Sequence, residues 1–258
     1  MLELNARITG QGDPVVLLHG LFGSLENLGG IARQLAPHFE VHALDLRNHG
    51  RSPHTDSLHY SAMADDVLHY LDQQGLSEIR LLGHSMGGKV GMTLALTAPA
   101  RIKQLVVADI APVHYEAHHD GVFAGLAAID LAQLTSRQQA EEWLRPHVPE
   151  TPVRQFLLKN LVKSGDGGFQ WRLNLPSIVR HYPQILQGQH ADHPFTGPVL
   201  FIKGGLSDYI KPCYKEHTAS LFPNAQLKII PGTGHWLHAE KPELFARLVL
   251  RFFNAEGV

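Results

Sequence analysis

The stretch Gly83-His84-Ser85-Met86-Gly87 has the pattern G-x-S-x-G and stands between two segments of different character. Residues 79–82 form an Ile-Arg-Leu-Leu run of strand length, and residues 88–96 have the composition of a helix. A strand, a sharp turn and a helix are the context that a nucleophile elbow requires. The glycines leave room for the strand and helix to approach because they lack a Cβ. The stretch therefore predicts that Ser85 Oγ is exposed at the carboxyl end of a strand, facing the N–H groups of a helix start.

Strands and helices alternate on both sides of this stretch. Besides an edge strand over 2–9, the chain has apolar runs at 15–18, 41–46, 105–108, 199–202 and 227–230. Helical segments are expected at 27–36, 60–74, 213–221 and 242–253. Continuous apolar runs are typical of parallel strands that are buried on both faces. The alternation predicts an α/β fold, a doubly wound and mostly parallel sheet with helices on both faces.

The pattern changes between residues 113 and 194. No convincing strand is visible there, and short helices are expected over 122–132, 136–144, 153–162 and 176–186. We interpret this segment as a small helical cap inserted between two strands of a core domain formed by residues 1–112 and 195–258. In open parallel sheets ligands bind at the carboxyl ends of the strands, so the cap is expected to cover that edge.

Composition and charge argue against several classes of protein. The 258 residues carry a net charge of −2, with 44% hydrophobic and 18% charged residues, which gives no basis for binding nucleic acid or an anionic membrane. The first residues lack the pattern of a signal peptide, and no apolar window is long enough to span a membrane. The single Cys213 excludes an internal disulfide. We expect a cytoplasmic protein, with its oligomeric state left open.

A serine needs a base to act as a nucleophile, and the base needs a carboxylate to hold its tautomer. The best base is His235, although the chain has 18 histidines, because it follows the last strand in a glycine-rich loop. Two carboxylates compete for the third role. Asp208 follows the strand at 199–202, the commonest place for the acid in such folds, and Asp109 ends the preceding strand. Spacing alone leaves both open.

An oxyanion formed on attack needs two preorganised donors. We expect one from the backbone N–H of Met86 and the other from Leu21, with Phe22 as the alternative. Trp236 is a candidate wall of the substrate pocket. No cofactor is expected, because no phosphate-binding loop is visible. No metal is expected either, since the histidines at 114, 118 and 119 lack carboxylate or cysteine companions and are interpreted as a surface segment.

Five segments resemble one superfamily: LLHGLFGS at 17–24, DLRNHGRSP at 45–53, GHSMGGK at 83–89, ADIAPV at 108–113 and PGTGHWLHAEKP at 231–242. They are similar to α/β-hydrolases, and more narrowly to small bacterial esterases of the YbfF type, close to mammalian abhydrolase-domain-containing protein 11. The resemblance implies a Ser-His-Asp esterase or thioesterase with Ser85 as nucleophile and His235 as base. It also implies Asp109 as the acid, because the Asp of the D-I-A-P-V segment takes that role in this group.

The leading hypothesis is a serine carboxylesterase that acts on short-chain acyl esters, with acyl-CoA thioesters as a further candidate. Another α/β-hydrolase chemistry is the first alternative: an aminopeptidase, a C–C bond hydrolase or a perhydrolase, because fold does not fix function. A ligand receptor that has lost turnover is the alternative from a different class.

Overall fold

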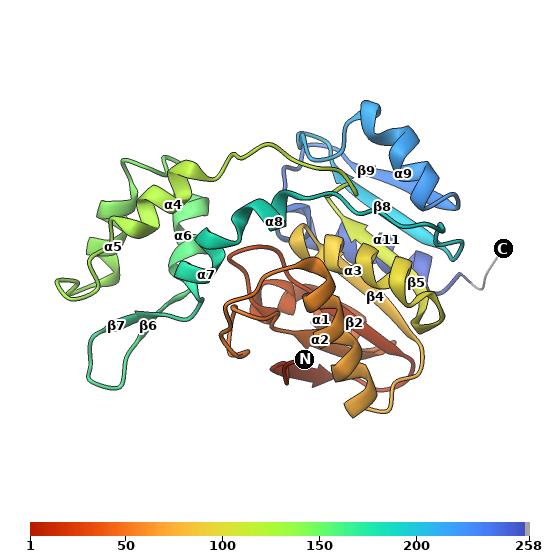
Figure 1. The fold of residues 1–258 in the computed structure, drawn as a ribbon, viewed down its shortest axis with the longest axis horizontal. Helices are drawn as coiled ribbons and strands as arrows, with labels where there is room; N and C mark the ends of the chain where they lie inside the picture. Colours follow the sequence, from red (N-terminus) through yellow and green to blue (C-terminus); the bar gives the residue numbers. More distant parts are fainter. Residues whose placement is uncertain (256–258) are drawn as a thin grey trace.

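A seven-stranded sheet forms the centre of the protein (Figure 1). The computed structural model describes residues 1–255, and within them the strand order is β1-β3-β2-β4-β5-β8-β9. The strands are β1 Ala6–Thr9, β2 Pro14–Leu18, β3 Glu40–Leu44, β4 Ile79–His84, β5 Ile102–Ala108, β8 Val199–Gly204 and β9 Ala225–Ile230. Strand β1 is antiparallel to β3, and the other neighbouring pairs are parallel. The predicted α/β class is confirmed, although the edge strand begins at Ala6 and not at residue 2.

Successive residues of the inner strands face opposite sides of the sheet. Val15 and Leu17 belong to one buried cluster, while Val16 and Leu18 belong to the other. Helices α1 and α11 pack on the first face, and α2, α3 and α9 cover the second. The core helices are α1 Gly29–Leu35, α2 Tyr60–Gln73, α3 Met86–Thr97, α9 Lys215–Leu221, α10 Leu237–Glu240 and α11 Pro242–Phe253, with 3-10 turns η1 Leu25–Leu28, η2 Pro99–Arg101 and η3 Pro212–Tyr214.

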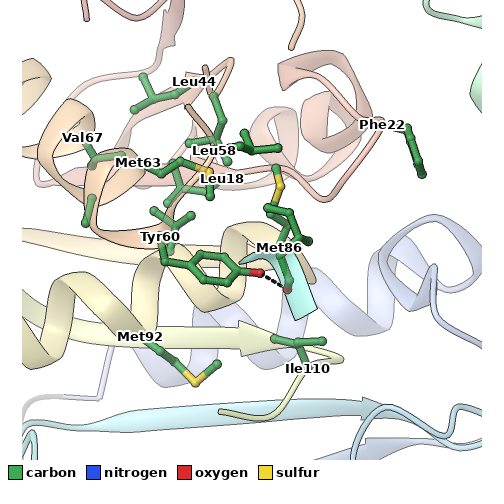
Figure 2. Packing of buried hydrophobic residues seen from close by; sticks show 14 of the residues in the cluster. Leu18, Phe22, Leu44, Leu58, Tyr60, Met63, Val67, Met86, Met92 and Ile110 are labelled. Carbon is green, nitrogen blue, oxygen red and sulfur yellow. Dashed lines mark hydrogen bonds between the residues drawn. The ribbon is translucent and has the colours of Figure 1, made fainter. Parts of the chain in front are cut away.

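The second cluster extends from the sheet toward the nucleophile stretch. Figure 2 shows part of it, including Leu18 at the end of β2, Met63 of α2 and Met86 at the start of α3. All three side chains are buried. The turn that carries Ser85 is therefore built on a packed apolar base, which restricts its movement.

The segment between β5 and β8 lies to one side of the sheet (Figure 1). Its elements are α4 Asp120–Ala127, α5 Arg137–Leu144, α6 Thr151–Leu158, β6 Leu161–Lys163, β7 Phe169–Trp171, α7 Leu175–Arg180 and α8 Tyr182–Leu186. We call residues 113–194 the cap. Within the described residues, no helix of the protein is both long enough and apolar enough to cross a bilayer.

The expectation that the cap contains no strand is wrong. Strands β6 and β7 pair antiparallel as a hairpin, in register from Leu161–Trp171 to Lys163–Phe169. Each has three residues, too few to show an alternating pattern, but the connecting Ser164-Gly165-Asp166-Gly167-Gly168 is a recognisable turn signal. The helix expected over 176–186 is likewise divided in two. Pro183 lacks the N–H that a continuous helix would require there.

Candidate active site

Ser85 occupies a sharp turn between β4 and α3. Its backbone has φ 52° and ψ −119°, a conformation that costs a non-glycine residue about 1–3 kcal/mol. The flanking glycines are required by close packing. A Cβ on Gly83 would lie 2.2 Å from the Gly87 carbonyl oxygen, and one on Gly87 would lie 2.3 Å from the carbonyl oxygen of Leu18. The geometry is that of a nucleophile elbow.

His235 follows β9 and is held by a buried carboxylate. Its Nδ1 donates to Asp109 Oδ2 at 2.8 Å, and the imidazole is 20% exposed while the Asp109 side chain is fully buried. Asp109 Oδ1 accepts the N–H of Gly204 at 2.9 Å, and Oδ2 also accepts the Ser207 hydroxyl. Because Nδ1 carries the donated proton, Nε2 is the nitrogen that can accept one.

Asp208, the other candidate acid, is not bonded to His235 within residues 1–255. Its side chain is exposed. The structure therefore brings Asp109 to the histidine, and not the alternative that strand position suggested.

Ser85 and His235 line one pocket of about 550 Å³ at the carboxyl edge of the sheet. The elbow also supports the histidine loop directly, since His84 Nε2 donates to the His235 carbonyl at 2.9 Å. In the described part of the chain no hydrogen bond yet joins Ser85 Oγ to His235. Such bonds are often long in a free enzyme and tighten when substrate binds.

The two expected oxyanion donors border this pocket. Met86 is the first residue of α3, so its N–H has no partner within the helix. The loop at Leu21 passes close to the nucleophile, because a Cβ on neighbouring Gly20 would lie 3.2 Å from Ser85 Cβ. The N–H of Phe22 donates to His49 Nε2 at 3.3 Å. Because the Phe22 N–H already has an acceptor, Leu21 is favoured over Phe22 as the second oxyanion donor.

Two buried imidazoles brace that loop. His19 Nε2 accepts the N–H of Leu46 at 3.0 Å, and its Nδ1 donates to the Gly20 carbonyl at 2.8 Å. His49 Nδ1 donates to the Arg47 carbonyl, which leaves Nε2 to accept from Phe22. Both rings act as neutral donor–acceptor bridges.

Burial keeps three histidines around the pocket neutral, and we therefore expect the folded protein to lose stability in acid. Loss of hydration lowers the pKa of His49, His119 and His238 from about 6.5 to about 3 each. Between about pH 3 and pH 6.5, the unfolded chain therefore binds more protons than the folded protein does. The full contribution to stability is present above about pH 6.5 and is lost as the pH falls, by on the order of 3 kcal/mol per histidine near pH 4.5.

Urea unfolding between pH 7 and pH 4.5 measures this loss. His238→Gln should reduce the dependence on pH, whereas His114→Asn, which changes an exposed histidine, should leave it unchanged. A free energy of unfolding that stays constant over this range would contradict the expectation.

The sequence did not predict the aromatic side chains that surround His235. The ring of Tyr209 stacks on His235 with centroids 4.1 Å apart and an angle of 24°. The Tyr209 hydroxyl bonds His118 Nε2, and His119 Nδ1 bonds the Tyr182 hydroxyl. No sequence pattern marks Tyr209. The histidines at 114 and 118 are exposed, as expected of a surface segment, and His119 is half-buried. The sequence did not indicate that His118 and His119 also line the pocket.

Trp236 lies in the pocket wall beside its neighbour His235. Its ring packs against Phe156 of helix α6, with centroids 5.5 Å apart. The cap and the core therefore meet at this point of the pocket wall. Within residues 1–255 no cluster of histidine, cysteine and carboxylate side chains is arranged to hold a metal ion.

Comparisons with known proteins point to one family. A family model described as the alpha/beta hydrolase fold matches residues 13–242. Esterase YbfF of Escherichia coli is 43% identical over 93% of both chains, and the mouse protein named sn-1-specific diacylglycerol lipase ABHD11 is 41% identical over 92% of this chain and 80% of its own. A solved marine microorganism esterase matches with a TM-score of 0.96 and 40% identity, covering 98% of this chain and 100% of that one. The resemblance drawn from the five motifs is confirmed, and the chain belongs to the α/β-hydrolase family as a serine ester hydrolase.

Proposed function

We propose that the protein hydrolyses short-chain acyl esters, and acyl-CoA thioesters as a second substrate class, through a Ser85-His235-Asp109 triad. One observation supports the proposal most strongly. His235, which donates to the buried Asp109 carboxylate at 2.8 Å, lines the same pocket as Ser85, a serine on a nucleophile elbow. A buried carboxylate that fixes the imidazole tautomer is the arrangement that activates a serine.

In the proposed reaction, Ser85 Oγ attacks the acyl carbonyl carbon while His235 Nε2 takes the hydroxyl proton. The resulting oxyanion is stabilised by the N–H groups of Leu21 and Met86, each worth about 10²–10³ in rate. His235 then protonates the leaving alcohol or thiol, and the acyl group remains on Ser85. Water, activated by the same imidazole, attacks this acyl-enzyme and releases the carboxylic acid. Asp109 keeps its hydrogen bond to Nδ1 and stabilises the imidazolium.

The pocket supports an acyl substrate because much of its wall is apolar. The core contributes Leu21 and Ile110, and the cap contributes Val153, Phe156 and Ile185. Burial of one methylene is worth about 0.8 kcal/mol, a factor of about four in kcat/KM. We therefore expect kcat/KM to rise with acyl length until the pocket is filled, and then to fall.

An acyl-length series tests the proposal. The p-nitrophenyl esters and the CoA thioesters from acetyl to palmitoyl are hydrolysed in parallel, together with a diacylglycerol, the lipid class in the name of the mouse relative. Enzyme pretreated with a fluorophosphonate provides the control. A short-chain optimum that disappears after pretreatment is expected. Absence of any sensitive turnover in these series would overturn the proposal and favour another hydrolase chemistry or a receptor.

An aminopeptidase has less support. It would need a free carboxylate in the pocket to bind the substrate amine. Among the described lining residues, Glu26 is paired with Arg172 and Glu240 accepts the N–H of Gly234. Asp109, the acid of the proposed triad, is committed to His235.

A further inference from the structure

A buried lysine connects the nucleophile helix to the cap. Lys89 lies in α3 with a 1% exposed surface, and its backbone N–H donates to the Ser85 carbonyl at 3.1 Å. Its ammonium donates to the carbonyl oxygens of Val113 at 2.8 Å, Leu186 at 3.3 Å and Gln187 at 2.5 Å. Val113 begins the cap, and the other two residues end its last helix. One side chain thus holds both crossings between cap and core.

The two crossings are also paired with each other. The N–H of Tyr115 donates to the Leu186 carbonyl at 2.9 Å, and the N–H of Gln189 donates to the carbonyl of Pro112 at 3.1 Å. These backbone bonds join the two connecting segments to each other but do not fix them to the sheet.

Two core side chains supply that attachment. The hydroxyl of Tyr60 donates to the Ile185 carbonyl at 2.7 Å. Lys89, one helical turn from Ser85, binds the carbonyls on both segments.

The lysine is bound by oxygen atoms and aromatic faces. Its ammonium lies 4.8 Å from the centroid of Tyr115 and 5.6 Å from that of Tyr60, whose position in the core is shown in Figure 2. Among the described residues it forms no ion pair with a carboxylate. Burial lowers the pKa of Lys89 to about 7, so the charged form depends on these partners for its stabilisation.

The geometry points to Lys89 as a positioning residue that fixes the cap over Ser85 and thereby determines how well the enzyme uses substrates large enough to contact the cap. The inference rests on the proposed ester hydrolysis. An ammonium has three protons to donate, and all three are engaged by carbonyl oxygens, so none remains for a substrate. The effect of Lys89 is therefore exerted through the cap.

The pocket lining explains why substrate size is the sensitive variable. Ser85, Leu21, Met86 and His235, which perform the proposed chemistry, all belong to the core, whereas the cap supplies much of the outer apolar wall. An acetyl ester needs mainly the core groups. A hexanoyl ester also needs the cap wall, which is displaced when three buried carbonyls lose their donor.

Lys89→Met tests the inference, because methionine has a similar length and no proton to donate. We expect kcat/KM for p-nitrophenyl acetate to fall about threefold and that for the hexanoate to fall about thirtyfold, mostly through KM. Labelling of Ser85 by a small fluorophosphonate should continue. Equal losses for both esters, or no loss for the hexanoate, would overturn the inference.

A matched control and a second variant complete the experiment. Arg101→Met removes bonds to two carbonyls of the core, at Leu76 and Ser77, and should leave the hexanoate-to-acetate ratio unchanged. If Lys89→Met does not fold, Lys89→Arg serves instead, since a planar guanidinium cannot match three carbonyls that surround a point charge. Its ratio should also fall.

Hydrogen exchange separates this inference from the proposed function. Amides of residues 113–116 and 186–190 should exchange faster in Lys89→Met than in the wild-type protein, whether or not either ester is a substrate. Unchanged exchange in both segments would contradict the role of Lys89. Lack of turnover by the wild-type protein would contradict the proposed function alone.

Discussion

Ser85→Ala is expected to lower kcat for ester hydrolysis by about 10⁶-fold, because no acyl-enzyme can form without the hydroxyl. The oxyanion donors and the binding pocket remain, so hydrolysis some 10³-fold above the rate in water is expected to persist. Steady-state hydrolysis of p-nitrophenyl esters over a wide range of enzyme concentration measures the loss.

The matched control is Ser220→Ala, which changes an exposed serine of α9 whose hydroxyl bonds only the His217 carbonyl among the described residues. It should retain full activity. If Ser85→Ala kept activity within about tenfold of the wild-type protein, the nucleophile would have to be another group, such as an activated water.

Asp109→Asn is expected to lower kcat by about 10⁴-fold, whereas Asp208→Asn should have a mild effect. An amide in place of the Asp109 carboxylate can present an N–H to His235 Nδ1, which selects the wrong imidazole tautomer. It also removes the charge that would stabilise the imidazolium. Asp208 is exposed, so its replacement leaves the bond between His235 and Asp109 intact.

Kinetic assays of both variants, with thermal unfolding as the measure of fold, check this expectation. Both side chains become amides, so each variant is the control for the other. The reverse pattern, a severe loss for Asp208→Asn and a mild one for Asp109→Asn, would assign the acid to the other strand end.

The fold was predictable because its decisive signals are local. Gly83, Ser85 and Gly87 define a turn whose glycines are required by contacts under 3 Å, and the apolar runs of β2 and β5 are buried on both faces. Such features can be recognised in the sequence because they depend on residues that are close together in the chain. The candidate nucleophile and base were accessible for the same reason, since each follows a recognisable strand.

The identity of the acid, the residues that contact His235 and the structure of the cap depend on contacts between residues that are far apart in the sequence. Asp109 and His235 are 126 positions apart, and the stacking of Tyr209 on His235 follows from the packing of two loops. Lys89 lies in a segment with an ordinary helical pattern, and nothing near it in the sequence indicates its carbonyl partners. The strand pattern shows which strand ends meet at this edge of the sheet, but not which side chains touch there; only the family resemblance indicated Asp109 rather than Asp208.

Ser85 and Asp109 share a backbone conformation that costs folding stability. Both have φ 52°, the left-handed region in which glycine is the most comfortable residue, and they end neighbouring strands of the sheet. Glycine at either position would relieve this backbone strain. The chain therefore carries a cost in folding stability at two positions that supply a hydroxyl and a carboxylate to the proposed triad, which is expected of an enzyme and weighs against a passive receptor.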